Sequence, residues 1–273
     1  MGKSLRRYIA IVALAGLASV ADKAGAQAQV DVDLKLVLAV DISMSMDPEE
    51  QKLQRDGYVS AFRDPNIIRA IRGGQRGRIA VTYFEWAGPQ VQTVLLPWQI
   101  IDDETSANAF ADNLVRQPYT RQRRTSISSA LIFGQNLLVE AAYRSNRNVI
   151  DVSGDGVNNS GPLLALTRAN VLASGIVING LPILIKPTLQ WSPWDAPDLD
   201  LYYGGCVVGG PGSFMIPITT IEGFATATRQ KLLLEIAVAP LHGFVRVQQE
   251  KRDVQSYDCG LVERNIERRQ WDN

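Results

Sequence analysis

Apolar runs of strand length alternate along the chain with stretches whose apolar residues recur at helical spacing. The most continuous run, Leu34–Val40, lacks the polar alternation of a half-exposed strand and predicts a strand buried on both faces. Arg78–Trp86 is rich in β-branched and aromatic residues, and Val91–Leu96 follows it across a short turn, which predicts an antiparallel hairpin at a sheet edge. Further strands are expected at Asn148–Ser153 and Ile176–Ile185.

Helix signals fill the intervals between these strands. In the clearest, Asp47-Pro48-Glu49-Glu50, a capping Asp, a Pro and first-turn acids predict a helix that runs to about Phe62 and ends before Asp64-Pro65. Other helices are expected over residues 102–116, 126–142, 162–173 and 221–237. Strands separated by such helices form right-handed βαβ units, so the sequence predicts a doubly wound α/β fold with helices on both faces. Its sheet should be mostly parallel, with one antiparallel edge strand.

Lys186–Gly212 interrupts this alternation. The segment contains Trp191 and Trp194 and ends in a glycine-rich run. A loop of this length inside a compact domain is usually functional or disordered. Two interpretations of the tryptophans stay open, because they could anchor an interface or cover a sheet edge.

The first 28 residues have the organisation of a secretory signal peptide. Basic residues at positions 3, 6 and 7 precede an apolar stretch from Tyr8 to about Ala21, and small residues lead to Ala28. A membrane anchor is the alternative, but the stretch is shorter than the roughly 20 residues that span a bilayer. We therefore expect cleavage near Ala28 and export to the periplasm or the extracellular space. The domain should then cover residues 29–240, followed by a C-terminal extension over 241–273.

The charge balance disfavours a general attraction to nucleic acid or anionic lipid. The chain has 28 basic and 28 acidic residues; without the four basic and one acidic residues of the predicted signal peptide, 24 and 27 remain, a net charge of −3. Hydrophobic residues make up 46% of the chain and charged residues 21%, which is typical of one large globular domain. We expect no nucleic-acid partner and no transmembrane segment in the mature chain, and the oligomeric state stays open.

Cys206 and Cys259 are the only cysteines, and both lie in the part of the chain expected to be exported. An oxidising compartment favours a disulfide between them, which would tie the C-terminal extension to the domain. Two free buried thiols are the alternative. Metal ligation by the pair is disfavoured because His242 is the only histidine, and this single His is better interpreted as structural.

Oxygen-bearing side chains occur at three points near the carboxyl edge of the predicted sheet. Asp41, Ser43 and Ser45 follow the first strand on alternate positions, Thr125 precedes a helix, and Asp155 follows a later strand. Ligands of open parallel sheets bind beyond this edge. Hydroxyls and carboxylates without His or Cys suit a hard cation such as Mg²⁺, although Mn²⁺ or Ca²⁺ would also accept oxygen ligands. The alternative is that Asp41 and the serines only cap the following helix and a turn.

This set of residues resembles the metal-ion-dependent adhesion site (MIDAS) of the von Willebrand factor type A (vWA) domain. The Asp-x-Ser-x-Ser signature matches at Asp41, Ser43 and Ser45, while the family's separate Thr and second Asp match Thr125 and Asp155, in family order. The resemblance implies that the three hydroxyls contact the metal directly or nearly so and that the two carboxylates act mainly through waters. It further implies that an Asp or Glu of a protein partner fills the open coordination position.

The vWA resemblance covers about residues 34–237. More narrowly, the signal peptide together with VDISMSM, RTSISSAL, VIDVSGDGVNN, CVVGGPGSF and FATATRQKLLLEIA resembles a bacterial exported vWA-like family of unknown function. One departure from the vWA pattern is the insertion of Gly154 before Asp155, with Asn158-Asn159 after it. The inserted residues affect how the side chain of Asp155 is positioned relative to the other candidate ligands.

The resemblance implies an exported binding protein, not an enzyme, that captures a protein partner through a divalent metal. Two alternatives are a metal-dependent hydrolase on a similar α/β face and an envelope scaffold whose metal only stabilises the fold. The sequence disfavours the hydrolase, since Ser43 stands where a second Asp would act as a general acid. A basic cluster beside the site would either attract an acidic partner or form a solvated loop; its members are Arg116, Arg121, Arg123 and Arg124.

Overall fold

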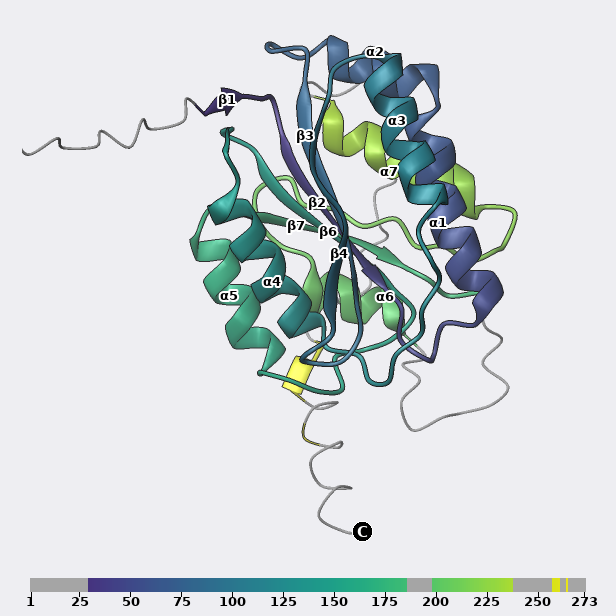
Figure 1. The fold of residues 1–273 in the computed structure, drawn as a ribbon. Helices are drawn as coiled ribbons and strands as arrows, with labels where there is room; N and C mark the ends of the chain where they lie inside the picture. The colour runs from purple at the N-terminus through teal and green to yellow at the C-terminus, as the bar shows by residue number, and fades with distance from the viewer. Residues whose placement is uncertain (1–28, 186–197, 238–256, 261–263, 265–273) are drawn as a thin grey trace, which may run out of the picture.

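A central sheet organises the fold. The computed structural model describes residues 29–185, 198–237, 257–260 and 264 (Figure 1). Within them the main sheet has five strands in the order β4-β3-β2-β6-β7, namely β2 (Lys35–Asp41), β3 (Ile79–Trp86), β4 (Gln92–Ile101), β6 (Asn148–Gly154) and β7 (Val177–Pro182). Of these strands, β4 at one edge is antiparallel to its neighbour, and the other pairs are parallel. The predicted sheet, including its antiparallel edge strand, is confirmed.

Helices cover both faces of the sheet (Figure 1). One layer consists of α1 (Pro48–Phe62), α2 (Pro65–Arg72), α3 (Glu104–Val115) and α7 (Phe224–Ile236). The other consists of α4 (Ile127–Glu140), α5 (Leu164–Ala173), the short α6 (Leu199–Tyr202) and the π-helix η1 (Tyr203–Val207). A separate parallel pair joins β1 (Val30–Asp31) to β5 (Tyr143–Arg144).

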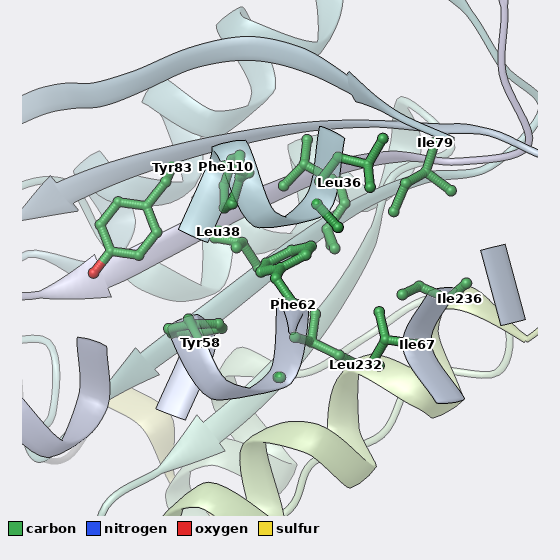
Figure 2. Close-up of a cluster of buried hydrophobic side chains, with 14 of the residues drawn as sticks. Leu36, Leu38, Tyr58, Phe62, Ile67, Ile79, Tyr83, Phe110, Leu232 and Ile236 are labelled. Carbon is green, nitrogen blue, oxygen red and sulfur yellow. The ribbon is translucent and has the colours of Figure 1, made fainter. Parts of the chain in front are cut away.

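Strand β2 divides two hydrophobic cores. Leu36 and Leu38 belong to the core under α1, α3 and α7, where Tyr58 lies with them (Figure 2). Val37 and Ala39 belong to the core under α4 and α5. Successive side chains of a strand point to opposite faces, so a strand between two helical layers is apolar at nearly every position. The prediction of a doubly buried strand is confirmed, since every residue of β2 is buried.

The predicted start of α1 is confirmed. Asp47 Oδ1 accepts hydrogen bonds of 2.8 Å from the backbone N–H groups of Glu49 and Glu50, and Glu50 Oε2 accepts one from Asp47 N. Helix α2 was not expected. Asp64 caps it and Pro65 is its first residue, so the interpretation of Asp64-Pro65 as only the end of α1 is incomplete.

Strand β4 is longer than predicted. It continues beyond Leu96 through Pro97 to Ile101. Pro97 lacks a backbone N–H, but an edge strand has one unpaired row of donors and therefore tolerates proline.

Part of the segment 186–212 is helical instead of being a simple loop. Residues Leu199–Val207 form α6 and η1 because Tyr202 and Tyr203 are buried in the second core. The predictions for Trp191, Trp194 and His242 lie outside the described residues, as do those for residues 1–28 and for most of 241–273. The described ranges include no helix with both the length and the apolarity needed to cross a membrane.

The predicted disulfide is present between Cys206 of η1 and Cys259, with 5.5 Å between the two Cα atoms. Beside it, the ring of Tyr257 lies edge-on to that of Tyr202, with 5.9 Å between centroids. The short segment 257–260 is thus attached to the second core, near the carboxyl end of β6.

Candidate metal-binding site

The candidate site lies where the strand order of the sheet reverses. From β2 the chain passes through α1 to β3 on one side, whereas from β6 it passes through α5 to β7 on the other. The chain therefore leaves the carboxyl ends of β2 and β6 toward opposite sides of the sheet, the arrangement that marks the ligand-binding crevice of an open α/β sheet. In α/β folds this switch point is the usual position of a ligand.

The loop after β2 directs one carboxylate and two hydroxyls toward this crevice. Asp41 is the last residue of β2, and its Oδ1 accepts a hydrogen bond of 2.7 Å from Ser43 N. The Oγ atoms of Ser43 and Ser45 are 2.8 Å apart. Asp41 and Ser43 are fully buried, whereas Ser45 is exposed. The turn therefore presents its polar atoms from the sheet outward to solvent.

Asp155 completes this arrangement from the loop after β6. Ser45 Oγ donates a hydrogen bond of 2.6 Å to Asp155 Oδ1, although the two residues are 110 positions apart. Gly154, the residue inserted before Asp155, lies directly against Asp41: a Cβ atom there would be 2.7 Å from Asp41 Oδ2 and 3.0 Å from Asp41 Cβ. Only glycine permits this approach of the two loops. The departure from the vWA pattern thus allows Asp155 to reach the serines.

Thr125 lies at the same point, in front of α4. A Cβ atom at Gly156 would lie 3.7 Å from Thr125 Oγ1 and 3.9 Å from Ser45 Oγ, so both hydroxyls border the turn that carries Asp155. Thr125 is buried, and its backbone is held twice by Asn159. Thr125 N donates to Asn159 Oδ1 at 2.8 Å, and Asn159 N donates to Thr125 O at 2.9 Å. The structure therefore brings all five predicted residues together.

Asn158 supports the other side of this turn. Its Oδ1 accepts a hydrogen bond of 3.1 Å from Ser128 N in the first turn of α4, and its backbone N–H donates to the Tyr202 hydroxyl at 3.0 Å. Asn158-Asn159 therefore fixes the loop after β6 to the start of α4. Sequence reasoning noted this pair only as a departure; two consecutive asparagines in a turn, whose side chains readily bond backbone groups, were the available signal.

A second group of polar residues, which the sequence analysis did not identify, lies beneath the site on α1. Gln54 Nε2 donates a hydrogen bond of 2.6 Å to Ser153 Oγ, one residue before Gly154. Arg55 forms a buried ion pair of 2.6 Å with Glu85 and donates to the carbonyl oxygens of Gln117 and Pro118, at 2.6 and 3.0 Å. Burial raises the pKa of Glu85, and Arg55 opposes this shift. The helical spacing of Gln51, Gln54 and Arg55 was the signal for a polar stripe facing inward.

The chemistry of the cluster fits a hard divalent cation. It offers three hydroxyls and two carboxylates, whereas the described residues contain no group of three or more His, Cys, Asp or Glu side chains placed to hold a metal ion. Oxygen donors of this kind match Mg²⁺. Burial raises the pKa of the neighbouring Tyr203 hydroxyl well above its ordinary value, and the negative charges of Asp41 and Asp155 raise it further. Tyr203 therefore stays neutral and adds no negative charge.

The arginine-rich segment beside Thr125 contacts the site through one member. Arg121 Nη2 donates a hydrogen bond of 2.8 Å to Met44 O, between the two serines. Gln122 N also donates to Ile42 O at 3.0 Å. The four arginines are exposed, and Arg121 places its positive charge next to the oxygen cluster. Those arginines are Arg116, Arg121, Arg123 and Arg124.

Solved structures of vWA proteins share this fold at low sequence identity. Proximal thread matrix protein 1 from the mussel byssus, with a zinc-occupied MIDAS motif, is 12% identical with a TM-score of 0.51 over 76% of this chain and 48% of its own. The pilus adhesin SpaC from Lactobacillus rhamnosus GG is 11% identical with a TM-score of 0.56, over 75% and 30%. The von Willebrand factor type A protein from Catenulispora acidiphila is 14% identical with a TM-score of 0.50, over 75% and 43%. The chain thus spans half or less of the length of these proteins.

None of the curated proteins matches the chain significantly. One family model, described as a protein of unknown function (DUF1194), matches residues 31–240. The chain therefore belongs to the DUF1194 family, and its fold is that of a von Willebrand factor type A domain.

Proposed function

We propose that this protein captures a protein partner through a divalent metal ion, Mg²⁺ in the first place, with Mn²⁺ or Ca²⁺ as the other oxygen-seeking candidates. Ser43, Ser45 and Thr125 would hold the ion with their hydroxyls, and Asp41 and Asp155 would supply the negative charge. The observation that carries the proposal is the hydrogen-bonded convergence of three loops at the switch point of the sheet. The bound ion would supply a positive centre for a carboxylate of the partner.

The balance of charge supports an acidic ligand. The site's own carboxylates are only two, and Ser45 and Asp155 are the members that reach solvent. The exposed arginines beside them add positive charge that would draw acidic groups toward the ion. An Asp or Glu side chain of a partner is therefore the ligand that best complements the site.

The local chemistry supports binding over hydrolysis. A hydrolase of the kind considered above would need a general acid near Asp41, but the residue two positions on is Ser43, which donates its backbone N–H to Asp41. Tyr203, the buried hydroxyl nearby, is held protonated by its raised pKa. We therefore propose a non-enzymatic role.

Export of the protein is part of the same proposal. The signal-like residues 1–28, with cleavage near Ala28, and the Cys206–Cys259 disulfide suit an oxidising compartment, either periplasmic or extracellular. The mature protein would then consist of the domain 29–240 and the extension 241–273. The similarity in fold to a matrix protein and a pilus adhesin supports a role outside the cytoplasm.

Calorimetric titration with Mg²⁺ and capture from an envelope extract together test this proposal. The protein should bind Mg²⁺, and it should retain a partner that EDTA releases. Asp41→Ala and Ser43→Ala should abolish both, whereas Ser174→Ala, just beyond the C-terminal end of α5, should change neither. A partner that is retained in EDTA and by Ser43→Ala would contradict the proposal. If chelation lowers Tm but leaves capture intact, the metal is structural only.

A further inference from the structure

A groove lies next to the candidate metal site, between the first turns of α1 and the segment that precedes Thr125. Its volume is about 440 Å³, and it is lined by Pro48, Gln51, Lys52, Tyr119, Thr120 and Arg121. One lining residue, Arg121, also donates its hydrogen bond to Met44 O in the loop that carries Ser43 and Ser45. The groove and the oxygen cluster therefore share one wall.

The walls of the groove are held in place from beneath. Gln51 Nε2 donates a hydrogen bond of 3.2 Å to Thr120 O and joins the two sides. The guanidinium carbon of Arg55 lies 3.8 Å from the centroid of the Tyr119 ring. Because Arg55 is buried and paired with Glu85, it supports Tyr119 from a fixed position. The groove is thus part of the folded structure and does not depend on exposed side chains alone.

The charge of the groove is positive. Among the described residues that line it, Lys52 and Arg121 are the charged ones. Lys52 pairs with Asp56 one turn later, but both side chains are largely exposed, and such pairs are weak in water. Pro48 and Tyr119 add apolar surface for the methylene part of a ligand side chain. An Asp or Glu side chain fits this combination of cations and apolar walls.

We infer that this groove binds a second acidic side chain of the same partner segment that offers its first carboxylate to the metal. The inference rests on the proposed function. It specifies the partner further: an acidic segment with at least two carboxylates, one for the ion and one for the pair formed by Lys52 and Arg121. A partner with a single carboxylate would use only half of the surface.

Selection from a phage-displayed library of random peptides, on immobilised protein in Mg²⁺ with elution by EDTA, tests the inference. The wild-type protein should enrich peptides with two acidic residues at a preferred separation. Lys52→Glu should weaken binding of a synthetic copy of such a peptide by roughly tenfold, the value of one charged hydrogen bond. Arg121→Ala should have a similar effect. Arg69→Glu on α2 is the matched control, because its exposed side chain bonds only Asn66 of its own helix among the described contacts.

The results separate this inference from the proposed function. Replacing the second acid of the peptide by its amide should weaken binding to the wild type but not to Lys52→Glu. Equal selection by the wild type and Lys52→Glu, with release by EDTA, would overturn the groove and leave the metal site standing. If peptides are enriched on the wild type but are not released by EDTA, and this enrichment is lost in Lys52→Glu, metal-dependent binding is refuted, and with it the inference of two binding points. Calorimetry with Mg²⁺ alone shows whether each variant still binds the ion. If no peptides are enriched on any of the proteins, both proposals are refuted.

Discussion

Lys231 of α7 forms an ion pair with Asp151 of β6, and both side chains are almost completely buried. Lys231 also pairs with Glu235 one turn later on α7. Asn179 Nδ2 of β7 donates a hydrogen bond of 3.1 Å to Glu235, and the Tyr58 hydroxyl donates one of 3.3 Å to Asp151. One buried cation therefore faces two buried carboxylates near the middle of β6, the strand that leads to the candidate metal site.

This imbalance makes stability depend on pH. The pKa of Glu235 is raised from 4.5 to about 7, first by burial and then by the charge of Asp151, although Lys231 opposes the shift. Burial also raises the pKa of Asp151. The native protein therefore holds protons that the unfolded chain releases, so the free energy of unfolding should fall as pH rises from about 4.5 through about 7. Glu235→Gln should remove most of this slope.

Urea unfolding at a series of pH values between about 5 and 8 measures this slope. Glu140→Gln, an exposed position at the end of α4, is the control and should keep the wild-type slope. The same slope in Glu235→Gln would show that another group titrates.

Lys231→Met removes the cation and leaves both carboxylates buried. We expect a loss of about 3–5 kcal/mol in the free energy of unfolding near pH 8, since breaking a buried pair leaves uncompensated charge. The loss should be smaller near pH 5, where the carboxylates take up protons. Urea unfolding near pH 5 and near pH 8 measures this difference. An equal loss of unfolding free energy at the two pH values would argue for a packing effect alone.

Gly154→Ala should damage metal binding specifically. The added Cβ would come within 2.7 Å of Asp41 Oδ2, so the loops after β2 and β6 must separate. Gly156→Ala is a matched control, because its Cβ would meet Thr125 only at 3.7 Å, an ordinary contact. Calorimetry should show Mg²⁺ binding at least tenfold weaker for Gly154→Ala, the lower bound for disturbed metal-site support. Equal affinities of the two variants would contradict this role of Gly154.

Asn159→Ala should weaken the site through Thr125. The substitution removes the acceptor of the Thr125 N–H bond, and an unsatisfied buried donor costs about 1–3 kcal/mol. Mg²⁺ affinity should fall roughly tenfold, as for other residues that orient metal ligands. Asn170→Ala on the exposed face of α5 should leave both stability and affinity unchanged. An unaltered Mg²⁺ affinity in Asn159→Ala would remove Thr125 from the proposed ligands.

Replacement of both cysteines by serine should destabilise the protein without abolishing metal binding. The disulfide joins residues 53 positions apart, and a loop of this length corresponds to roughly 2–4 kcal/mol. Denaturant unfolding of Cys206→Ser/Cys259→Ser, compared with the wild type under non-reducing conditions, measures the loss. The prediction fails if the two proteins have the same unfolding midpoint.

The fold and the five candidate ligands were accessible from the sequence because their signals are local. Leu34–Val40 is apolar at every position except Lys35, and Asp47-Pro48 marks a helix start whose partners lie within three residues. Asp41, Ser43 and Ser45 follow each other in one turn. Such features do not require knowledge of which strands are neighbours.

The support of the site could not be predicted because it depends on distant pairs. Gln54 meets Ser153, and Arg55 meets Glu85, only after β2, β3 and β6 have been placed side by side. The close approach of Gly154 to Asp41 likewise follows from the parallel register of β2 and β6. Sequence spacing does not show such contacts, so the glycine inserted in a known motif was noted only as a departure from that motif.

The strand order has a consequence for how such proteins can diversify. The oxygen cluster is anchored mainly at the ends of β2 and β6, two of the three internal strands of the described sheet, whereas the groove is formed by the first turns of α1 and the peripheral segment 119–121. Under the two proposals above, substitutions at Tyr119 or Lys52 would therefore change which partner is selected while metal binding stays constant. Recognition and ion binding would then be separable traits of this chain, and a designer could exchange one without rebuilding the other.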